Sequence, residues 1–179
     1  ICVAIDHINE LWACELPAAF IWHHENLPWS LYRDTARWAY DEMRHATMGE
    51  RRLLAYGFEI GVDVPMVPDH WMGVAAKGGL EAMLFIVHGL EQGGPKWKQQ
   101  LKAELWDMGD PYTAQDCDYD WADEAGHIRY GQEWIKTLFP KMPKEEIIAR
   151  TQREVDDWKE WIAEKHRTGK HGYDVFMPR

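Results

Sequence analysis

Apolar and polar residues recur along this chain with the period of an α-helix. Apolar positions return every three or four residues through most of the sequence, and no stretch shows the two-residue alternation of a half-buried strand. The pattern predicts an all-α protein with five helical stretches. They cover about residues 1–26, 30–56, 71–107, 111–138 and 144–167.

Proline and glycine set the expected boundaries of these helices. The first is expected to end at Asn26-Leu27-Pro28, and Ser30 is the expected N-cap of the second. Residues 58–70 contain one glycine and two prolines, which predicts an extended connection. The third stretch is expected to break at Gly93-Gly94-Pro95. A one-sided apolar stripe on the last helix should pack on the others; it consists of Ile147, Ile148, Val155, Trp158, Trp161 and Ile162.

Length and composition narrow the class of protein. With 179 residues, 46% of them hydrophobic, the chain is expected to form one domain over residues 1–167, with a core at 1–138 and a tail at 168–179. The net charge of −10 argues against nucleic-acid binding, and no apolar run is long enough for a membrane span. Three cysteines without a CxxC pattern favour a reducing compartment, so we expect a cytoplasmic protein. The helical pattern already present at Ile1 leaves a longer N-terminus open.

The most informative motif is D-E-x-x-H, which occurs twice. It spans Asp41–His45 and Asp123–His127, and a single glutamate precedes each copy, Glu10 by 32 residues before Glu42 and Glu91 by 33 before Glu124. A shift of 81 or 82 residues therefore relates two halves of the chain. Each half supplies one glutamate on its first helix and Glu-x-x-His on its second, with the glutamate and histidine on one helical face.

The positions of these residues along their helices fit one level of a bundle. At 1.5 Å per residue, the ligands of both arms lie roughly 20–27 Å from the turn that joins them. The thirteen-residue connection at 58–70 can span about 40 Å when extended. The sequence therefore predicts a four-helix bundle of two helical hairpins, joined by one long crossover and followed by a fifth helix.

Four carboxylates and two imidazoles on facing helices are typical ligands of a dinuclear iron or manganese–iron site. Buried glutamates at one level need a cation to compensate them. We expect the two glutamates of the D-E-x-x-H motifs to bridge the ions, and the other glutamates and the histidines to complete each set. The predicted metal ligands are Glu10, Glu42, His45, Glu91, Glu124 and His127.

Other polar residues are expected to orient these ligands. Asp41 and Asp123 are suited to accept the free imidazole N–H of the histidine in the opposite hairpin, and Arg44 to pair with one of these acids. His7 and His88 lie one turn before Glu10 and Glu91, as additional ligands or as their hydrogen-bond partners.

These motifs resemble the ferritin-like di-iron carboxylate superfamily. Asp41-Glu42-Met43-Arg44-His45 matches the D-E-x-R-H signature of its oxygen-activating branch. A wider set resembles an uncharacterised ferritin-like family over about residues 5–138; it consists of Asn9-Glu10-Leu11-x3-Glu15, Leu27-Pro28, Tyr32-Arg33-Asp34, Gly109-Asp110 and Asp123-Glu124-x2-His127. The resemblance implies a ferritin-like bundle, a dinuclear site and reaction with O2.

Departures from this superfamily favour substrate oxidation. Ribonucleotide reductase small subunits carry a radical tyrosine four residues after the first histidine ligand, where this chain has Gly49, and Gly131 is its counterpart after His127. Both glycines either open a substrate pocket or permit close helix packing. Trp38 and Trp121 lie one turn before the ligands and are expected either to line that pocket or to fill the core.

The leading functional hypothesis is an oxidoreductase with an Fe/Fe or Mn/Fe centre that uses O2 to oxidise a small organic substrate. An electron donor and, where the chain self-associates, a homodimer are the expected partners, with no nucleic acid and no membrane. The first alternative is a ferroxidase that oxidises Fe(II) without an organic substrate. The second is a bundle that retains its carboxylates for stability alone.

Overall fold

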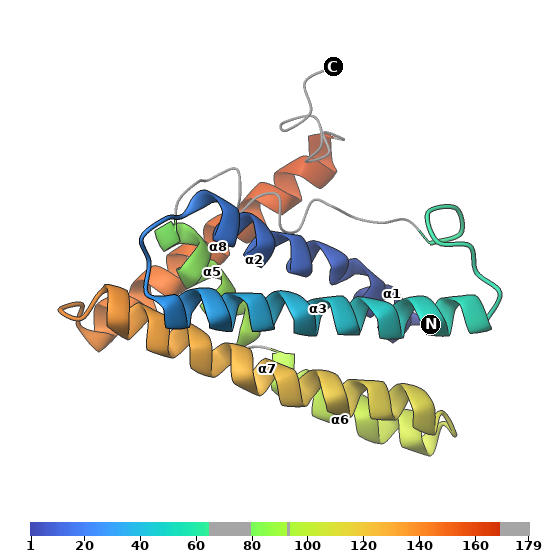
Figure 1. Cartoon of the computed structure of the whole chain (residues 1–179). Coiled ribbons are helices and arrows are strands. Elements are labelled where there is room, and N and C mark those ends of the chain that lie inside the picture. Colours follow the sequence, from blue (N-terminus) through green and yellow to red (C-terminus); the bar gives the residue numbers. More distant parts are fainter. Residues whose placement is uncertain (65–79, 93, 169–179) are drawn as a thin grey trace. The chain divides into compact units, whose positions relative to one another are not determined.

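A computed structural model describes residues 1–64, 80–92 and 94–168 (Figure 1). These residues form seven helices and no strand, so the all-α prediction is confirmed for them; Ile60 and Val64 make one isolated bridge. The helices are α1 (Cys2–Asn9), α2 (Leu11–His23), α3 (Trp29–Ala55), α5 (Leu80–Glu91), α6 (Gly94–Asp107), α7 (Pro111–Leu138) and α8 (Lys144–Thr168).

The chain divides into two compact units. Unit 1 comprises residues 1–67 and 94–126, and unit 2 comprises residues 68–93 and 127–179. Unit 1 therefore holds α1, α2, α3, α6 and the first half of α7, whereas unit 2 holds α5, the second half of α7 and α8. The single domain expected over residues 1–167 stays a prediction.

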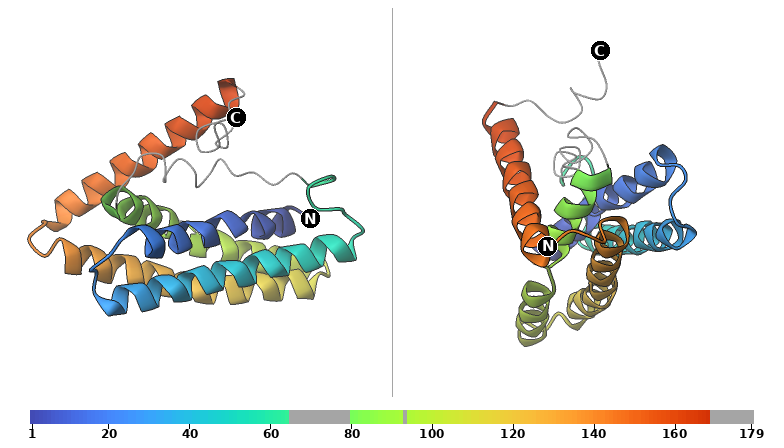
Figure 2. Two further views of the ribbon diagram at one scale, coloured as in Figure 1. Left: turned by 45° about the horizontal axis from the view of Figure 1, so that its top comes forward. Right: turned by 90° about the vertical axis from the view of Figure 1, so that its left-hand side faces the viewer.

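In unit 1, two antiparallel arrangements bring distant segments together. Figures 1 and 2 show α1 and α2 running along α3 in the opposite direction, and α6 returning along α7 after a tight turn. Gly109 in that turn has a φ of 79°, which suits glycine because it has no Cβ. One buried cluster joins α1 to α6 and α7, and a second joins α1 to α3 and the residues after it. The first contains Val3, Leu105, Ala114 and Cys117, and the second Ala4, Ile8, Leu53 and Val64.

The first helix is interrupted where the sequence predicts a continuous one. The chain leaves α1 after Asn9 and enters α2 at Leu11, with Glu10 between them. The Glu10 N–H bonds to the His7 carbonyl three residues back, and the Asn9 side chain donates to the Ile5 carbonyl at 2.8 Å. A side-chain amide that competes for a helix carbonyl weakens the regular ladder. The break therefore falls at a predicted metal ligand.

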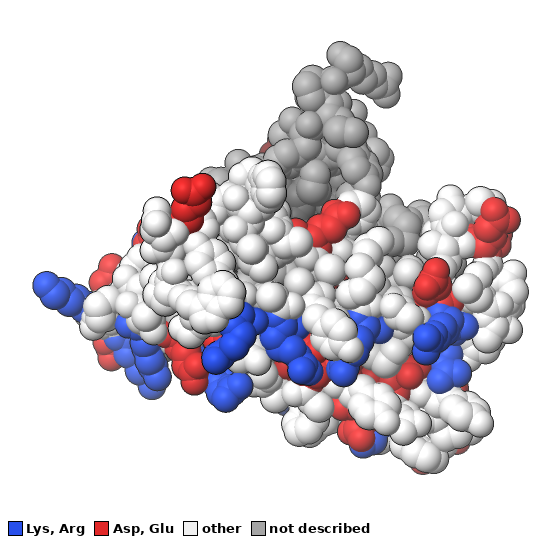
Figure 3. All heavy atoms as spheres, viewed as in Figure 1, with Lys and Arg blue, Asp and Glu red and all other residues white. Residues whose placement is uncertain are grey.

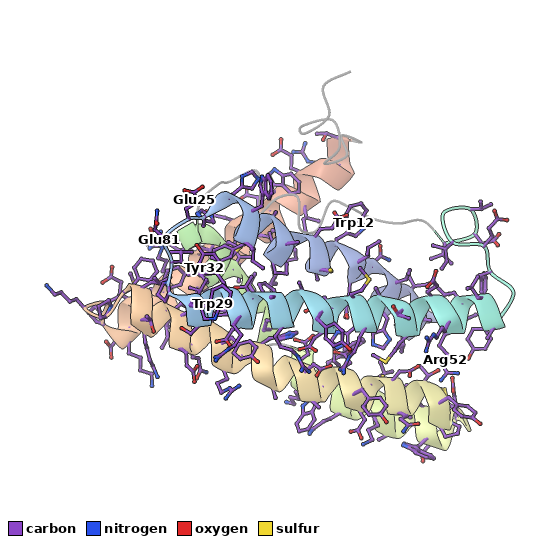
Figure 4. The ribbon with its side chains drawn as sticks, viewed as in Figure 1. Trp12, Glu25, Trp29, Tyr32, Arg52 and Glu81 are labelled. Atoms are coloured by element: carbon purple, nitrogen blue, oxygen red, sulfur yellow. The ribbon has the colours of Figure 1, made fainter. Side chains whose placement is uncertain are left out.

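The turn between α2 and α3 also differs from its predicted caps. α3 begins at Trp29, and the Pro28 carbonyl accepts the Leu31 N–H at 2.9 Å, so Ser30 lies inside the helix and its predicted N-cap role is wrong. Tyr32, labelled in Figure 4, secures the turn by donating its hydroxyl to the His24 carbonyl at 2.6 Å.

Unit 2 is held together by packing of α5 on α8. The Phe85 and Phe139 rings lie 5.7 Å apart, and the Arg150 guanidinium lies over the Phe85 ring. The predicted fifth helix at 144–167 corresponds to α8, which extends to Thr168. Within its apolar stripe Val155 is buried, but Ile148 is 58% exposed. Most of the predicted 58–70 connection and the tail lie outside the described residues.

A row of arginines follows α3 with acidic side chains beside it (Figure 3). Each pairs with an aspartate from α3 or α7, which balances the charge of this row; the arginines are Arg33, Arg37, Arg44 and Arg52. No helix in the described part of the chain combines the length and apolar character needed to cross a bilayer.

Candidate metal centre

Four segments of unit 1 bring charged side chains to one place. Glu10 lies at the α1–α2 break, His45 lies on α3, and Asp120 and Glu124 lie one turn apart on α7. One ligand atom from each of these four residues falls within 4.8 Å of the others, and we call this group the ligand cluster. Its last three members are buried, and Glu10 is partly buried.

His45 is at the centre of the ligand cluster. Its Nδ1 lies 2.8 Å from Glu10 Oε2, 3.6 Å from Asp120 Oδ1 and 3.7 Å from Glu42 Oε2. Glu42, the other ligand predicted on α3, is therefore next to the cluster on the same helical face.

Further hydrogen bonds hold these side chains in position. Asp123 Oδ2 lies 3.1 Å from His45 Nε2 and also pairs with Arg44, the contacts expected from the sequence. Because a carboxylate only accepts, Nε2 carries the proton in this contact, which leaves Nδ1 available as a ligand. Trp38 Nε1 donates to Glu42 Oε1 at 2.7 Å, so this tryptophan orients a predicted ligand.

The sequence did not identify Lys98 and Asp120 as site residues. Lys98 on α6 is 8% exposed, and its ammonium pairs with Asp120, with Glu124 Oε1 at 3.2 Å and with Glu10 Oε1 at 3.7 Å. Asp120 also accepts from His7 Nε2 at 3.0 Å. The repeat offered a signal for Asp120, since a shift of 82 residues relates it to Trp38. The break between α5 and α6 concealed any such signal for Lys98.

The charges in the ligand cluster shift one another's protonation. Burial alone would lower the pKa of His45, but hydrogen bonds to Asp123 and to nearby glutamates raise it well above its usual range. The pKa of Lys98 is likewise raised by the surrounding carboxylates against the effect of burial. Burial and the Glu10 charge raise the pKa of Asp120, whereas Lys98 and His45 outweigh burial at Glu10 and lower its pKa. Without a further cation, the cluster depends on protonated Lys98 and His45.

The donor set fits a metal ion. Three carboxylates and one imidazole nitrogen are hard and borderline ligands of the kind that iron and manganese accept. Glu10 Oε2 is buried, has no well-aligned hydrogen-bond partner among the described residues, and lies only 2.8 Å from His45 Nδ1. Two electron-pair donors at that separation need a proton or a cation between them. The structure thus supports metal binding by this cluster, without showing which metal or how many ions.

The remaining predicted ligands belong to unit 2. His127 Nδ1 lies 3.9 Å from Glu91 Oε1, and both residues are buried. His127 follows Glu124 by one turn on α7, so the two share a helical face. That Glu91 and His127 complete one centre with Glu42 and Glu124 stays a prediction from the sequence repeat.

The predicted outer residues have varied surroundings. Asp41 accepts from Arg37 Nε at 2.8 Å, and its predicted contact with a histidine of the opposite hairpin stays a prediction. Trp121 is half-buried on α7. His88 in unit 2 contacts Gln92 at 2.7 Å, and burial lowers its pKa.

The two predicted pocket glycines both lie at tight contacts. A Cβ added to Gly49 would fall 2.4 Å from the Ile8 amide nitrogen, so this glycine permits α1 to pack closely on α3. That contact matches the packing alternative that the sequence left open. A Cβ on Gly131 would fall 3.1 Å from His88 Nδ1, so the imidazole occupies the space beside it.

Comparison with known proteins gives a family and no activity. No curated protein and no solved structure significantly matches this chain. A family model described as "Protein of unknown function (DUF455)" matches residues 2–174, nearly the entire length. The chain therefore belongs to the DUF455 family.

Proposed function

We propose that this protein is a non-haem metal oxidoreductase built on a ferritin-like bundle, with a dinuclear Fe/Fe or Mn/Fe centre that uses O2 to oxidise a small organic substrate. The proposal is carried by the buried ligand cluster of Glu10, His45, Asp120 and Glu124, whose donor atoms lie within 4.8 Å of one another. The sequence repeat supports a second set of ligands, in which Glu91 and His127 join Glu42 and Glu124.

The bound metals would supply the redox chemistry. The chain would hold and orient them. Asp123 keeps the His45 proton on Nε2, so that Nδ1 presents its lone pair to the ion. Trp38 fixes one oxygen of Glu42, and His7 fixes one oxygen of Asp120. Burial of these side chains excludes bulk water, which strengthens every electrostatic interaction among them.

Metal analysis of ligand variants tests this function. The wild-type chain, purified after supply of iron and manganese, should carry two ions per chain, and Glu42→Ala or Glu124→Ala should abolish dinuclear loading. Glu50→Ala is the matched control, because Glu50 is an exposed glutamate on the same helix as Glu42. The ions are counted by elemental analysis and placed by anomalous scattering at the iron and manganese edges. If both ligand variants still bind two ions, the ligand assignment is wrong.

Turnover separates the proposed oxidase from a ferroxidase. Reduced protein exposed to O2 should consume oxygen in proportion to an oxidised organic product. Oxidation of added Fe(II), with stoichiometric iron uptake and no organic product, would instead establish the ferroxidase.

A second candidate is a metal-free helical protein, and Lys98 is the observation that favours it. A buried ammonium among three carboxylates supplies a positive charge that a metal would otherwise provide. This candidate requires that the purified protein hold no iron or manganese and that chelation leave the melting temperature unchanged. The oxidoreductase requires bound metal and a lower melting temperature after chelation.

A further inference from the structure

Unit 2 contains a cavity of about 830 Å³ between α5, the second half of α7 and α8. This volume is within the range of about 300–1,000 Å³ typical of small-molecule sites. All of its lining residues belong to unit 2, and none of them is a member of the ligand cluster.

The charge of the lining is opposite to that of the chain. Lys136, Lys144 and Lys159 line the cavity, and no aspartate or glutamate does, although the chain as a whole carries −10. None of these lysines forms an ion pair with any residue in the described ranges. Three unpaired ammonium groups on one cavity favour an anionic ligand.

The apolar part of the lining is aliphatic. It is formed by Ile135, Met142, Ile147, Ile148 and Val155, without any aromatic side chain. Of these, Ile148 is the apolar stripe residue that α8 leaves 58% exposed. Such a wall suits an alkyl chain better than a flat ring, since aromatic ligands are commonly held by stacking.

A buried polar group completes the lining. His88 is 7% exposed, and its Nε2 lies 2.7 Å from the Gln92 side-chain nitrogen. Because an amide nitrogen only donates, Nε2 accepts and the hydrogen of the neutral ring is on Nδ1. His88 Nδ1 is buried and has no hydrogen-bond partner among the described residues, and the same holds for Thr151 Oγ1. Both residues line the cavity, where an oxyanion would accept from them.

We propose that this cavity binds an amphipathic organic anion, with an aliphatic body against the isoleucines and a carboxylate or phosphate near the three lysines. Binding stands on the lining alone and needs no metal. Only the identification of this ligand with the molecule oxidised rests on the proposed function.

Titration calorimetry of the whole chain tests the proposal, with decanoate, decyl phosphate and decanol as probes. We expect saturable binding of one decanoate or decyl phosphate per chain, and binding of decanol weaker by about tenfold or more, since a charge-assisted contact contributes at least that factor. The better of the two anions identifies the head group. The titrations are run on chelated and on metal-supplied protein, so that failure of metal loading leaves the binding result readable.

Variants link the binding to this cavity. The triple variant Lys136→Gln/Lys144→Gln/Lys159→Gln should weaken decanoate binding at least about tenfold without changing decanol binding. Lys141→Gln is the control, because Lys141 is an exposed lysine between α7 and α8 that does not line the cavity. Ile148→Glu places a like charge on an exposed part of the wall and should abolish decanoate binding while the chain stays folded.

Two results would overturn the proposal. One is equal affinity for decanoate and decanol, or unchanged affinity in the triple variant. The other is a change in sedimentation mass, instead of ligand affinity, in the triple variant, which would make this face an interface between copies of the chain.

Discussion

At the scale of single residues, the buried Lys98 ammonium has the largest predicted energetic effect in unit 1. It contacts carboxylates from α7 and from the α1–α2 break, and it is almost inaccessible to water. Removing one partner of a buried ion pair leaves the other charges uncompensated, which usually costs about 3–5 kcal/mol. An exposed pair contributes about 0–1 kcal/mol.

We therefore predict that Lys98→Met lowers the free energy of unfolding of chelated protein by about 3–5 kcal/mol. Lys102→Met is the matched control on the same helix, since Lys102 pairs with a half-exposed Asp118, and should lose no more than about 1 kcal/mol. Urea titrations with and without Mn(II) measure both. Added Mn(II) should restore more stability to Lys98→Met than to the wild type. Equal losses in the two variants would show that Lys98 compensates nothing.

The Cys117 thiol gives a second prediction for a single residue. Burial, followed by the charge of Asp120, raises the pKa of Cys117 from 9.0 to about 12. The folded thiol thus stays protonated where the unfolded one ionises, so its stabilising effect is complete below about pH 9 and is lost as the pH rises towards 12. At pH 8, iodoacetamide should label Cys117 slowly in folded protein and rapidly in urea, as measured by peptide mass spectrometry. Rapid labelling of the folded chain would contradict this burial.

At the scale of helices, the contact of α1 with α3 depends on Gly49. The backbone of α1 passes so close that a Cβ on Gly49 would fall 2.5 Å from the Ala4 carbonyl oxygen and 2.8 Å from His7 Cβ. A methyl group there must displace α1, which carries His7 and ends at Glu10. The packing of one helix therefore determines the position of a metal ligand.

Gly49→Ala should accordingly reduce the free energy of unfolding by about 1–3 kcal/mol, as overpacking does, and weaken Mn(II) binding. The matched control is Gly126→Ala on α7, where an added Cβ meets no atom within 4 Å. That change should be neutral or stabilising by up to about 1 kcal/mol, because alanine favours helix. Urea unfolding and metal titration provide the two readouts. A stable Gly49→Ala protein with normal metal affinity would show that α1 adjusts freely.

Local periodicity predicted the helices well because each depends on residues within a few turns. The break at 93 and the turn at Gly109 were also predictable, since glycine and proline act on the backbone directly. The break at Glu10 was not, because no glycine marks it and Pro17 lies within α2.

The ligand cluster was only partly predictable for a related reason. The repeat identified Glu10, His45 and Glu124 through matched spacing. It did not reveal that the position equivalent to Trp38 holds Asp120, or that Lys98 reaches that acid from α6. Such contacts depend on tertiary packing between helices, which spacing along the chain does not encode.

At the scale of the whole molecule, one helix belongs to both compact units. α7 supplies Asp120 and Glu124 to unit 1, and His127 and the cavity wall at Ile135 to unit 2. A change in α7 therefore affects the ligand cluster and the lysine-lined cavity through the same backbone.

The overall charge of −10 leads to a prediction for the whole chain. Excess negative charge repels itself, and raising the ionic strength from about 0.01 M to about 0.15 M shortens the screening length from about 30 Å to about 8 Å. The melting temperature of chelated protein should rise over this interval. The variant Asp107→Asn/Glu133→Gln/Glu160→Gln, which changes three exposed acids and brings the charge to −7, should show a smaller rise. A fall with salt would mean that surface ion pairs dominate instead.

The position of Lys98 has a consequence for the order of assembly. A chain whose acidic side chains already have a cation of their own can complete folding before any metal arrives, so that maturation becomes an exchange of one cation for another. Selection between iron and manganese would then occur at a finished site, where the incoming ion must displace a tethered ammonium. The four-carbon stem of the lysine allows that group to withdraw without leaving the protein. Metal supply would thus control activity long after synthesis, with the lysine side chain as the reversible occupant.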